Sequence, residues 1–392
     1  MGIDFIFGIV FVFIMALFLY KAKSKVRLHK ILFPLVYIVQ YRDSLGINAM
    51  RWLGSFKFWD WIAPIINFTG FAGMIFIGAN LIWGLYANLV APQAIETIGI
   101  VQPFFPGIPG TVFVPFLYFI LSIFVIAVVH ECMHGILSFH YGIRVKASGF
   151  AIVGLLVPIL PAAFVEPDEK SLKRLPSSKQ IAIFAAGPFA NIVLALLLMG
   201  LMIYVAEPVS EAFFVPDGVE VAGFAADAKY PAELAGITQG ELIQSIDSIP
   251  VVSSANLTQI LGSYSPNKTI SLKTNASFYT LTLAANPKNL SRAYLGITSK
   301  SHIKENPVAQ EKYGLLVPFS QWFFGLLVWM FLLSLGVGLF NLLPLGPVDG
   351  GRMLHALLLV YLPKKKALSI WAKVTAVVIL LIIANLVIGF IK

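Results

Sequence analysis

A short motif near the middle of the chain, His-Glu-Cys-Met-His at positions 130–134, combines two histidines with a glutamate. On a helix, which turns about 100° per residue, His130 and His134 lie one above the other on the same face. Two stacked imidazoles can bind one Zn²⁺, and Glu131 beside them can take a proton from water at such a site. The motif lies in the otherwise apolar run 111–139. Because polar groups are costly at membrane depth, this setting favours a functional site over a chance match or two core histidines.

Catalytic zinc needs a third protein ligand and one open position. The single cysteine, Cys132, excludes an intrachain disulfide and any CxxC metal site, so the third ligand must be His, Asp or Glu. His140 lies ten residues after His130, about 15 Å along a helix, which is too far to share a metal. His355 is more typical of a capping or interface residue. Neither histidine is therefore a good third ligand.

Asp349 is the strongest candidate for the third ligand. It is a lone carboxylate in a stretch of prolines and glycines that breaks a helix at membrane depth. Gly350 and Gly351, which follow it, let backbone segments approach closely. An alternative role for Asp349, as the N-cap of a helix over 350–361, is also chemically sound.

The composition identifies an integral membrane protein. The chain has 392 residues, of which 58% are hydrophobic and only 12% are charged, and its mean hydropathy is +0.85. Soluble domains are about 25% charged. The net charge of +9 does not indicate a nucleic-acid partner, because the basic residues cluster in short loops beside apolar runs.

The hydropathy pattern predicts an α-helical polytopic membrane protein with about six transmembrane helices. These are expected at residues 3–20, 62–88, 111–139, 180–206, 316–343 and 367–391. We interpret the first as a retained span, because no basic residue precedes it and no small-residue cleavage site follows.

Basic residues gather at 21–30, 140–179 and 364–366, which predicts that these loops are cytoplasmic. Residues 91–110 contain no Lys or Arg and suit an outer loop. Both chain ends and a polar insert at 207–315 are then expected outside. The third span runs inward, with the histidines roughly 15 Å from its cytoplasmic end.

Two further segments have a distinctive composition. Residues 31–60 mix aromatic and basic residues and are typical of a membrane interface. The apolar run 148–165 is rich in Gly and Pro and too interrupted for a spanning helix. It suits either a re-entrant segment buried against protein or a loop on the membrane surface.

The insert at 207–315 is the size of one small soluble domain. Its alternating runs and turn signals predict a compact α+β pattern. The expected strands are 219–224, 241–246, 268–274 and 278–284, and the expected helical segments are 231–236 and 254–262.

HExxH in one membrane helix, followed far downstream by an Asp-Gly motif, resembles the site-2 protease family of intramembrane zinc metalloproteases. Residues 341–350 fit the family pattern NxxPxPxLDG at Asn341, Pro344, Asp349 and Gly350, and depart from it at Gly346 and Val348. Gly187-Pro188-Phe189-Ala190-Asn191 looks like the family's GPxxN element. By itself, an asparagine at this depth is either a contact between helices or a hydrogen-bonding group for substrate.

The insert resembles a PDZ domain. Residues 230–237 and 240–243 fit the pattern SPAxxAGL…GDxI, and residues 294–297 look like the carboxylate-binding loop. The resemblance to the protease family covers roughly 110–360. It divides the chain into an N-terminal membrane region at 1–110, a first half of the protease core at 111–206, the PDZ-like domain at 207–315, and a second half of the core at 316–392.

The resemblance implies hydrolysis of peptide bonds within or near transmembrane helices of membrane-protein substrates. One Zn²⁺ is expected on His130, His134 and Asp349, with Glu131 as the catalytic base. Asn191 and Asn341 are expected to bind substrate backbone that has unwound. The PDZ-like domain is expected either to bind a peptide or C-terminus by adding a strand, or to exclude substrates with large outer domains.

Two other functions remain open at this level. In a membrane metal or ion transporter, the His, Glu and Asp cluster would form an ion path. In an inactive scaffold, the PDZ-like domain would carry the function. A transporter has no need of a peptide-binding domain, and a scaffold has no need of the complete set of metal-type residues.

Overall fold

In the computed structural model, the described residues are 2–391 except 22–23, 25, 33–35, 91–98, 104–106, 109, 156, 226–227 and 288. Lys23 and Lys25 of the first basic cluster, and the first part of the expected outer loop at 91–110, lie outside the described residues. Residue contacts divide the chain into two compact units. The first is Met1–Met202 together with Phe324–Lys392, and the second is Ile203–Phe323.

Five helices among the described residues are long and apolar enough to cross a membrane. They are α3 (Trp59–Val90), α4 (Phe116–His140), α6 (Ser177–Leu201, continued by a π-helical turn Met202–Ala206 and α7, Glu207–Phe213), α11 (Leu316–Asn341) and α13 (Lys364–Ile391). The expected first span falls on α1 (Gly2–Lys21), whose described apolar stretch, Ile6–Leu17, is shorter. A polytopic helical membrane protein is thus confirmed, and the expected first span at 3–20 stays a prediction.

The third span begins later than expected. Residues Thr111–Phe113 form a short strand, β4, that pairs in parallel with β3 (Ile100–Gln102). The helix starts at Phe116, after Pro115 in the N-cap position. A proline disfavours helical backbone in the residue before it, so the apolar run divides at this point.

The four-stranded sheet in the first unit was not anticipated. Its strands are β1 (Val26–Leu32), β2 (Val36–Asp43), β5 (Val145–Leu155) and β6 (Val157–Pro167). They lie in the order β1-β2-β5-β6, all neighbours antiparallel, with β6 at one edge. The segment 148–165 lies within a β-hairpin, a strand structure that the sequence did not predict, and its position in or on the membrane stays a prediction. Strand β5 of this hairpin also pairs with β2, which lies far earlier in the chain.

The open end of this hairpin is fastened to the short helix α5 (Glu169–Leu172). Asp168 caps α5 by accepting a hydrogen bond from Ser171 N at 3.0 Å, and it forms an ion pair with Lys146 of β5 at 2.6 Å. The Lys146 ammonium and the Ser171 donors hold the pKa of Asp168 well below its usual range. The hairpin is therefore fixed at both strands where it meets the helical part of the unit.

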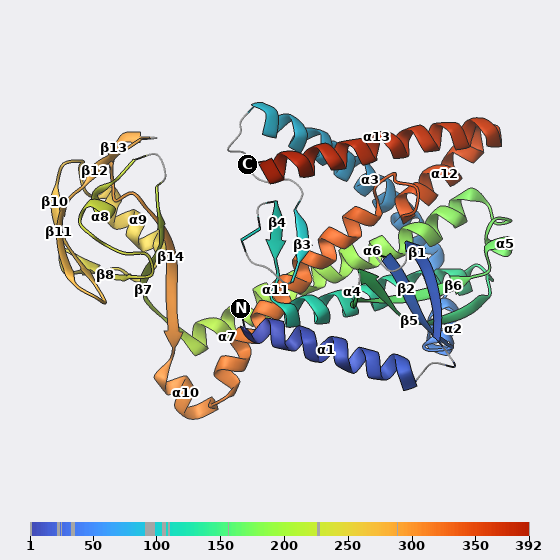
Figure 1. Cartoon of the computed structure of the whole chain (residues 1–392), viewed down its shortest axis with the longest axis horizontal. Helices are drawn as coiled ribbons and strands as arrows, with labels where there is room; N and C mark the ends of the chain where they lie inside the picture. Colours follow the sequence, from blue (N-terminus) through green and yellow to red (C-terminus); the bar gives the residue numbers. More distant parts are fainter. Residues whose placement is uncertain are drawn as a thin grey trace. The chain divides into compact units, whose positions relative to one another are not determined.

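Small residues bring three helices of the first unit close together. On α6, Ala182, Ala185 and Ala186 are fully buried, and α6 packs against α4 and α12 (Asp349–Tyr361). Figure 1 shows α4 and α6 side by side, with strand β6 near α4. On α3, a Cβ at Gly70 would lie 2.6 Å from Met353 of α12. Lipid tails are as apolar as the side chains of a membrane helix, so the hydrophobic effect does not drive such helices together. Close packing of this kind holds them together instead.

The second unit contains a curved sheet with the order β11-β10-β8-β7-β14 and a short β9 beside β8 (Figure 1). The strands are β7 (Phe214–Phe224), β8 (Leu242–Ile246), β9 (Ile249–Pro250), β10 (Thr269–Thr274), β11 (Phe278–Thr282) and β14 (Ile297–Glu305). The remaining elements are α8 (Pro231–Leu234), α9 (Ser254–Gly262), the ribbon β12 (Ala284–Asn286) with β13 (Asn289–Tyr294), and α10 (Pro307–Tyr313). A soluble-type β-containing unit is confirmed, and its identity as a PDZ domain stays a prediction.

Candidate metal centre

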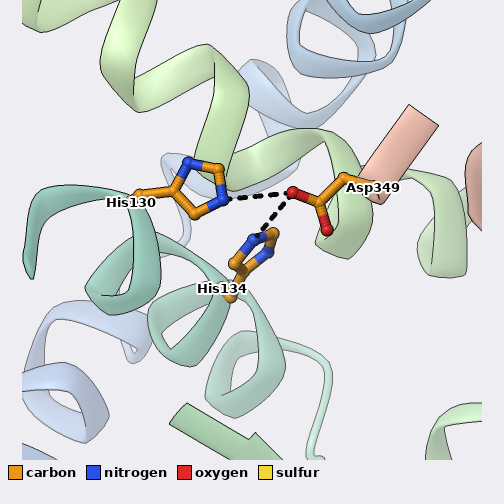
Figure 2. Close-up of side chains that lie close together, drawn as sticks. All are labelled: His130, His134 and Asp349. Carbon is orange, nitrogen blue, oxygen red and sulfur yellow. Dashed lines mark hydrogen bonds and ion pairs between the residues drawn. The ribbon is translucent and has the colours of Figure 1, made fainter. Parts of the chain in front are cut away.

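Three metal-type side chains converge from two helices of the first unit (Figure 2). His130 and His134 come from successive turns of α4, and Asp349 is the first residue of α12. Asp349 Oδ2 lies 3.1 Å from His130 Nε2 and 3.4 Å from His134 Nε2. One ligand atom from each residue lies within 4.8 Å of the others, and this is the one such group among the described residues.

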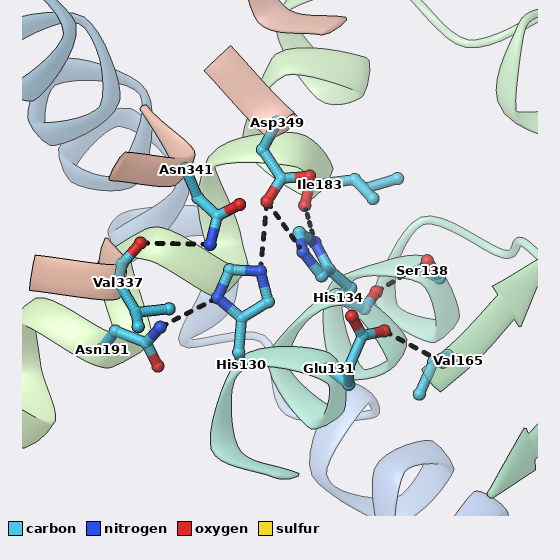
Figure 3. Close-up of polar contacts among 10 residues, drawn as sticks. All are labelled: His130, Glu131, His134, Ser138, Val165, Ile183, Asn191, Val337, Asn341 and Asp349. Carbon is cyan, nitrogen blue, oxygen red and sulfur yellow. Dashed lines mark hydrogen bonds and ion pairs between the residues drawn. The ribbon is translucent and has the colours of Figure 1, made fainter. Parts of the chain in front are cut away.

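The second nitrogen of each imidazole is engaged by α6 (Figure 3). His134 Nδ1 lies 2.6 Å from the carbonyl oxygen of Ile183, to which it donates its proton. His130 Nδ1 lies 2.9 Å from the side-chain amide of Asn191. Contacts at Nδ1 fix the ring orientation and leave Nε2 as the ligand atom. Both Nε2 atoms face the same point beside Asp349.

A glycine on α6 makes room for the two imidazoles. A Cβ at Gly187 would lie 2.6 Å from His130 Nε2 and directly against His134 Nε2. No side chain longer than hydrogen fits there without moving the rings. In the sequence, Gly187 stands out only as part of the GPxxN element, because the room it leaves depends on which face of α6 meets α4.

Asp349 is presented by close backbone packing after the helix break. The N-cap of α12 is Val348, and no side chain caps this helix end. The alternative of Asp349 as the N-cap is therefore wrong: it is the first helical residue, and its carboxylate points to the histidines. Cβ atoms at Gly350 and Gly351 would collide with the carbonyl groups of Leu342 and Leu345. The two glycines therefore allow the close approach of backbone segments that their positions predict.

Glu131 shares a cavity with the three metal-type residues. The cavity has a volume of about 330 Å³ and lies between α4, β6, α6 and the segment that joins α11 to α12. Glu131 Oε2 accepts a hydrogen bond of 2.9 Å from the backbone N–H of Val165 on β6. The sheet edge thus supplies the contact that positions this carboxylate (Figure 3).

The two asparagines occupy different positions. Asn341 lines the cavity, and its Nδ2 donates to Val337 O one turn earlier in α11, at 3.0 Å. Asn191 is fully buried, is absent from the cavity lining, and contacts His130. The backbone carbonyl oxygen of Asn191 accepts a hydrogen bond from Ser334 Oγ at 2.8 Å. Only Asn341 is open to a bound chain.

The two histidines set aside as ligands lie elsewhere. His140 Nδ1 is 3.1 Å from Gly54 O and its Nε2 is 3.0 Å from Asp60 Oδ1, so it joins the end of α4 to the α2–α3 region. Here α2 spans Ile47–Gly54. The ring of His355 packs against Trp371 at a centroid distance of 5.8 Å.

Helices that cross a membrane, together with a His, His and Asp group beside a glutamate, define the class of membrane-embedded metallopeptidases. The model of Peptidase family M50 matches residues 118–382, about two thirds of the chain and the whole of the site. The protein belongs to this family, the site-2 protease family, whose members are zinc-dependent metallopeptidases. The family predicted from the sequence motifs is confirmed. An uncharacterized protein of Methanocaldococcus jannaschii is 26% identical over 322 residues, which cover 80% of this chain and 76% of that protein.

Proposed function

We propose that the protein is an intramembrane zinc metalloendopeptidase that cleaves membrane proteins within or near their transmembrane helices. The observation that carries the proposal is the meeting of His130 and His134, on the membrane-type helix α4, with Asp349 at the start of α12, and with Glu131 at the same cavity. Lone polar groups at this depth are costly unless they serve a function.

The residues fit a zinc ion. Two imidazole Nε2 atoms and one carboxylate oxygen form a three-ligand set with room for a fourth position, as catalytic zinc requires. The Ile183 carbonyl accepts the Nδ1 proton of His134, which leaves Nε2 of this histidine as the ligand atom, and Asn191 contacts the opposite ring nitrogen of His130. When bound, zinc would polarise the scissile carbonyl and make water a stronger nucleophile at neutral pH.

Glu131 is the proposed general base. Its carboxylate takes a proton from water as the water oxygen attacks the scissile carbonyl carbon. The C–N bond then breaks, and Glu131 returns the proton to the departing amine. The Val165 N–H, 2.9 Å from Oε2, holds the carboxylate toward the cavity throughout.

The edge of β6 offers a place for the substrate backbone. A transmembrane helix hides its carbonyl groups in hydrogen bonds, so the substrate must unwind before attack. An extended segment could add to β6, which pairs with β5 on one side and lines the cavity through Phe164 and Val165. Asn341, at the opposite side of the lining, is proposed to bind the same segment.

For Asn191 we propose a role different from the substrate contact that the family resemblance implied. A side chain with no exposure beside His130 Nδ1 orients the imidazole and does not reach a substrate. With its amide turned so that the oxygen faces His130, it accepts the Nδ1 proton of the zinc-binding tautomer.

The second unit is proposed to be a PDZ-like domain outside the cell membrane, with the active site toward the cytoplasmic side. The basic loops at 140–179 and 364–366 support this orientation. A cavity of about 170 Å³ lies between α9 and the β13–β14 segment, next to the edge strand β14. Strand addition there could bind a peptide or C-terminus; the alternative role is a size filter for substrates.

The decisive experiment measures cleavage of a single-span substrate by the purified protein, with wild type beside Glu131→Gln and zinc content determined for both. We expect about one zinc in each protein and a loss of cleavage of about 10²–10⁴-fold in the variant. Cleavage by the variant would show that Glu131 is not the base. An absence of zinc from both would overturn the metal site, and a metal flux altered by Glu131→Gln would favour a transporter.

A further inference from the structure

A second cavity adjoins the catalytic one in the first unit. Its volume is about 420 Å³, and it lies among α5, α6, α12 and α13. The two cavities share the side chains of Leu172, Phe184 and Arg352, which form the wall between them. Nothing in the proposed peptidase chemistry uses this second cavity.

Cationic side chains dominate its charged lining. The charged lining residues are three cations and one carboxylate, namely Lys173, Arg352, Lys364 and Glu169, so the lining carries a net charge of +2. Arg352 is committed: it binds Glu169 at 2.8 Å, and its guanidinium lies 4.2 Å from the centre of the Phe184 ring. Lys173 is 3.7 Å from the same carboxylate with its side chain 75% exposed, a weak surface contact. The two lysines therefore supply the unbalanced charge.

The charges of these lysines meet at one imidazole. His355 of α12 lines the cavity, and burial lowers its pKa, with further lowering by Lys173 and then Lys364. Lys173 is the C-cap residue of α5 and Lys364 begins α13, so the two come from separate elements. Their fields overlap inside the cavity, where an anion would be attracted by both.

Apart from Gln180, the rest of the lining is apolar, and it opens outward. Leu359 is 42% exposed and Leu368 is 52% exposed. Trp371 lies beside them with its indole N–H donated to Gly351 O at 2.9 Å. Lys364 is the first residue of a membrane-type helix, and tryptophan and lysine together are typical of the membrane–water interface. The cavity thus joins a cationic region to an apolar surface at the depth of lipid head groups.

We propose that this cavity binds an anionic phospholipid, with the phosphate between Lys173 and Lys364 and the acyl chains along Leu359 and Leu368. Charge complementarity selects the head group, and the apolar side requires a lipid in place of a soluble anion. The bound lipid would contact α12, the helix that begins with Asp349. The proposal does not depend on peptidase activity.

The test uses the full chain in phosphatidylcholine vesicles that contain an increasing share of brominated phosphatidylglycerol, with Trp371 as the reporter. Bromine quenches indole fluorescence on contact, and the signal of Trp371 among the seven tryptophans is identified by its loss in Trp371→Phe. We expect saturable quenching of Trp371 by brominated phosphatidylglycerol. Brominated phosphatidylcholine at the same share should quench it far less.

The matched variants separate a built site from general attraction to a charged membrane. Lys173→Gln with Lys364→Gln should raise the half-saturating share of anionic lipid on the order of tenfold. Lys170→Gln with Lys365→Gln removes the same charge from the same two helices but from residues outside the lining, and should change it less than about twofold.

Three results would overturn the proposal. They are equal quenching by the two lipids, equal weakening in the two double variants, and displacement of the lipid by inorganic phosphate at matched concentration, which would indicate a site for a soluble anion. Since quenching reports lipid contact and not cleavage, each of these results is separate from a failure of the proposed protease.

Discussion

The amide of Asn191 on α6 lies 2.9 Å from Nδ1 of His130 on α4, in a position with no exposure. Ser334 Oγ of α11 in turn donates to the backbone carbonyl oxygen of Asn191. A chain of contacts therefore runs from α11 through α6 to the imidazole. On this ground we propose that Asn191 positions the metal centre and that Asn341 contacts the substrate.

The first prediction compares the two asparagines. Asn191→Leu should weaken zinc binding about 10–100-fold, the usual effect of removing a residue that orients a histidine ligand. Asn191→Asp should restore most of the affinity, because a carboxylate oxygen can accept the Nδ1 proton. Asn341→Leu should leave zinc affinity unchanged and lower kcat/KM. The measurement is zinc affinity by chelator competition, together with cleavage rates.

The opposite pattern would refute this division of roles. If Asn191→Leu kept zinc affinity and raised KM, Asn191 would contact substrate as the family resemblance implied.

The second prediction concerns the space above Gly187. Gly187→Ala places a methyl group against both Nε2 atoms, so zinc content after dialysis should fall well below that of the wild type. Gly200→Ala is the matched control, since it lies on the same helix with no atom within 4 Å of the added Cβ. Both changes gain about 1 kcal/mol of helix propensity, so a difference between them reports the collision. Equal zinc content in the two variants would show that the imidazoles move aside.

The third prediction concerns the contact between β6 and the base. Val165→Pro removes the N–H that Glu131 accepts, so kcat should fall at least about tenfold while zinc remains bound. Val165→Ala keeps the N–H and should retain most of the activity. Parallel losses in the two variants would instead assign the effect to the valine side chain.

The fourth prediction concerns a buried carboxylate in the second unit. Burial alone raises the pKa of Glu241, but hydrogen bonds from Thr274, Thr238 and Tyr279 outweigh it, so the pKa lies below its ordinary value. Glu241 therefore binds its proton less tightly in the folded state than in the unfolded state, where its pKa is about 4.3. The stabilisation is present above that pH and is lost as the pH falls through the folded pKa.

Hydrogen exchange checks this prediction. Protection factors of amides in β8 and β10, which correct for the intrinsic pH dependence of exchange, should decrease below about pH 4.3. Glu241→Gln should lower them at neutral pH and remove that dependence. The control is Glu233→Gln. It removes an ion pair with the exposed side chain of Lys229, so it should change the protection factors little. Retained acid dependence in Glu241→Gln would assign the effect to another group.

Local patterns predicted much of this molecule. Continuous apolar runs predicted five spans. A transmembrane helix forms all its backbone hydrogen bonds within itself, so its position can be predicted without knowledge of its neighbours. In the second unit, the expected helix 254–262 matches α9, where Ser253 accepts a hydrogen bond from Asn256 N as an N-cap. The HExxH spacing and the Asp-Gly motif predicted a group of His130, His134 and Asp349. One ligand atom from each of these residues lies within 4.8 Å of the others.

Features that depend on distant partners escaped prediction. The hairpin of β5 and β6 has no polar alternation, and its strand character arises from pairing with β2. The role of Asn191 depends on which face of α6 meets α4, and the space at Gly187 depends on the same packing. Helical periodicity cannot reveal these, since α6 is apolar around its circumference near the site.

The 219 residues that separate His130 from Asp349 affect how the protein is made. The ribosome releases α4 and the whole of the second unit before it synthesises the carboxylate that closes the metal group. A nascent or truncated chain that stops before α12 holds the two histidines and Glu131 without Asp349. Under the proposed function, the peptidase can become active only after α12 has been synthesised.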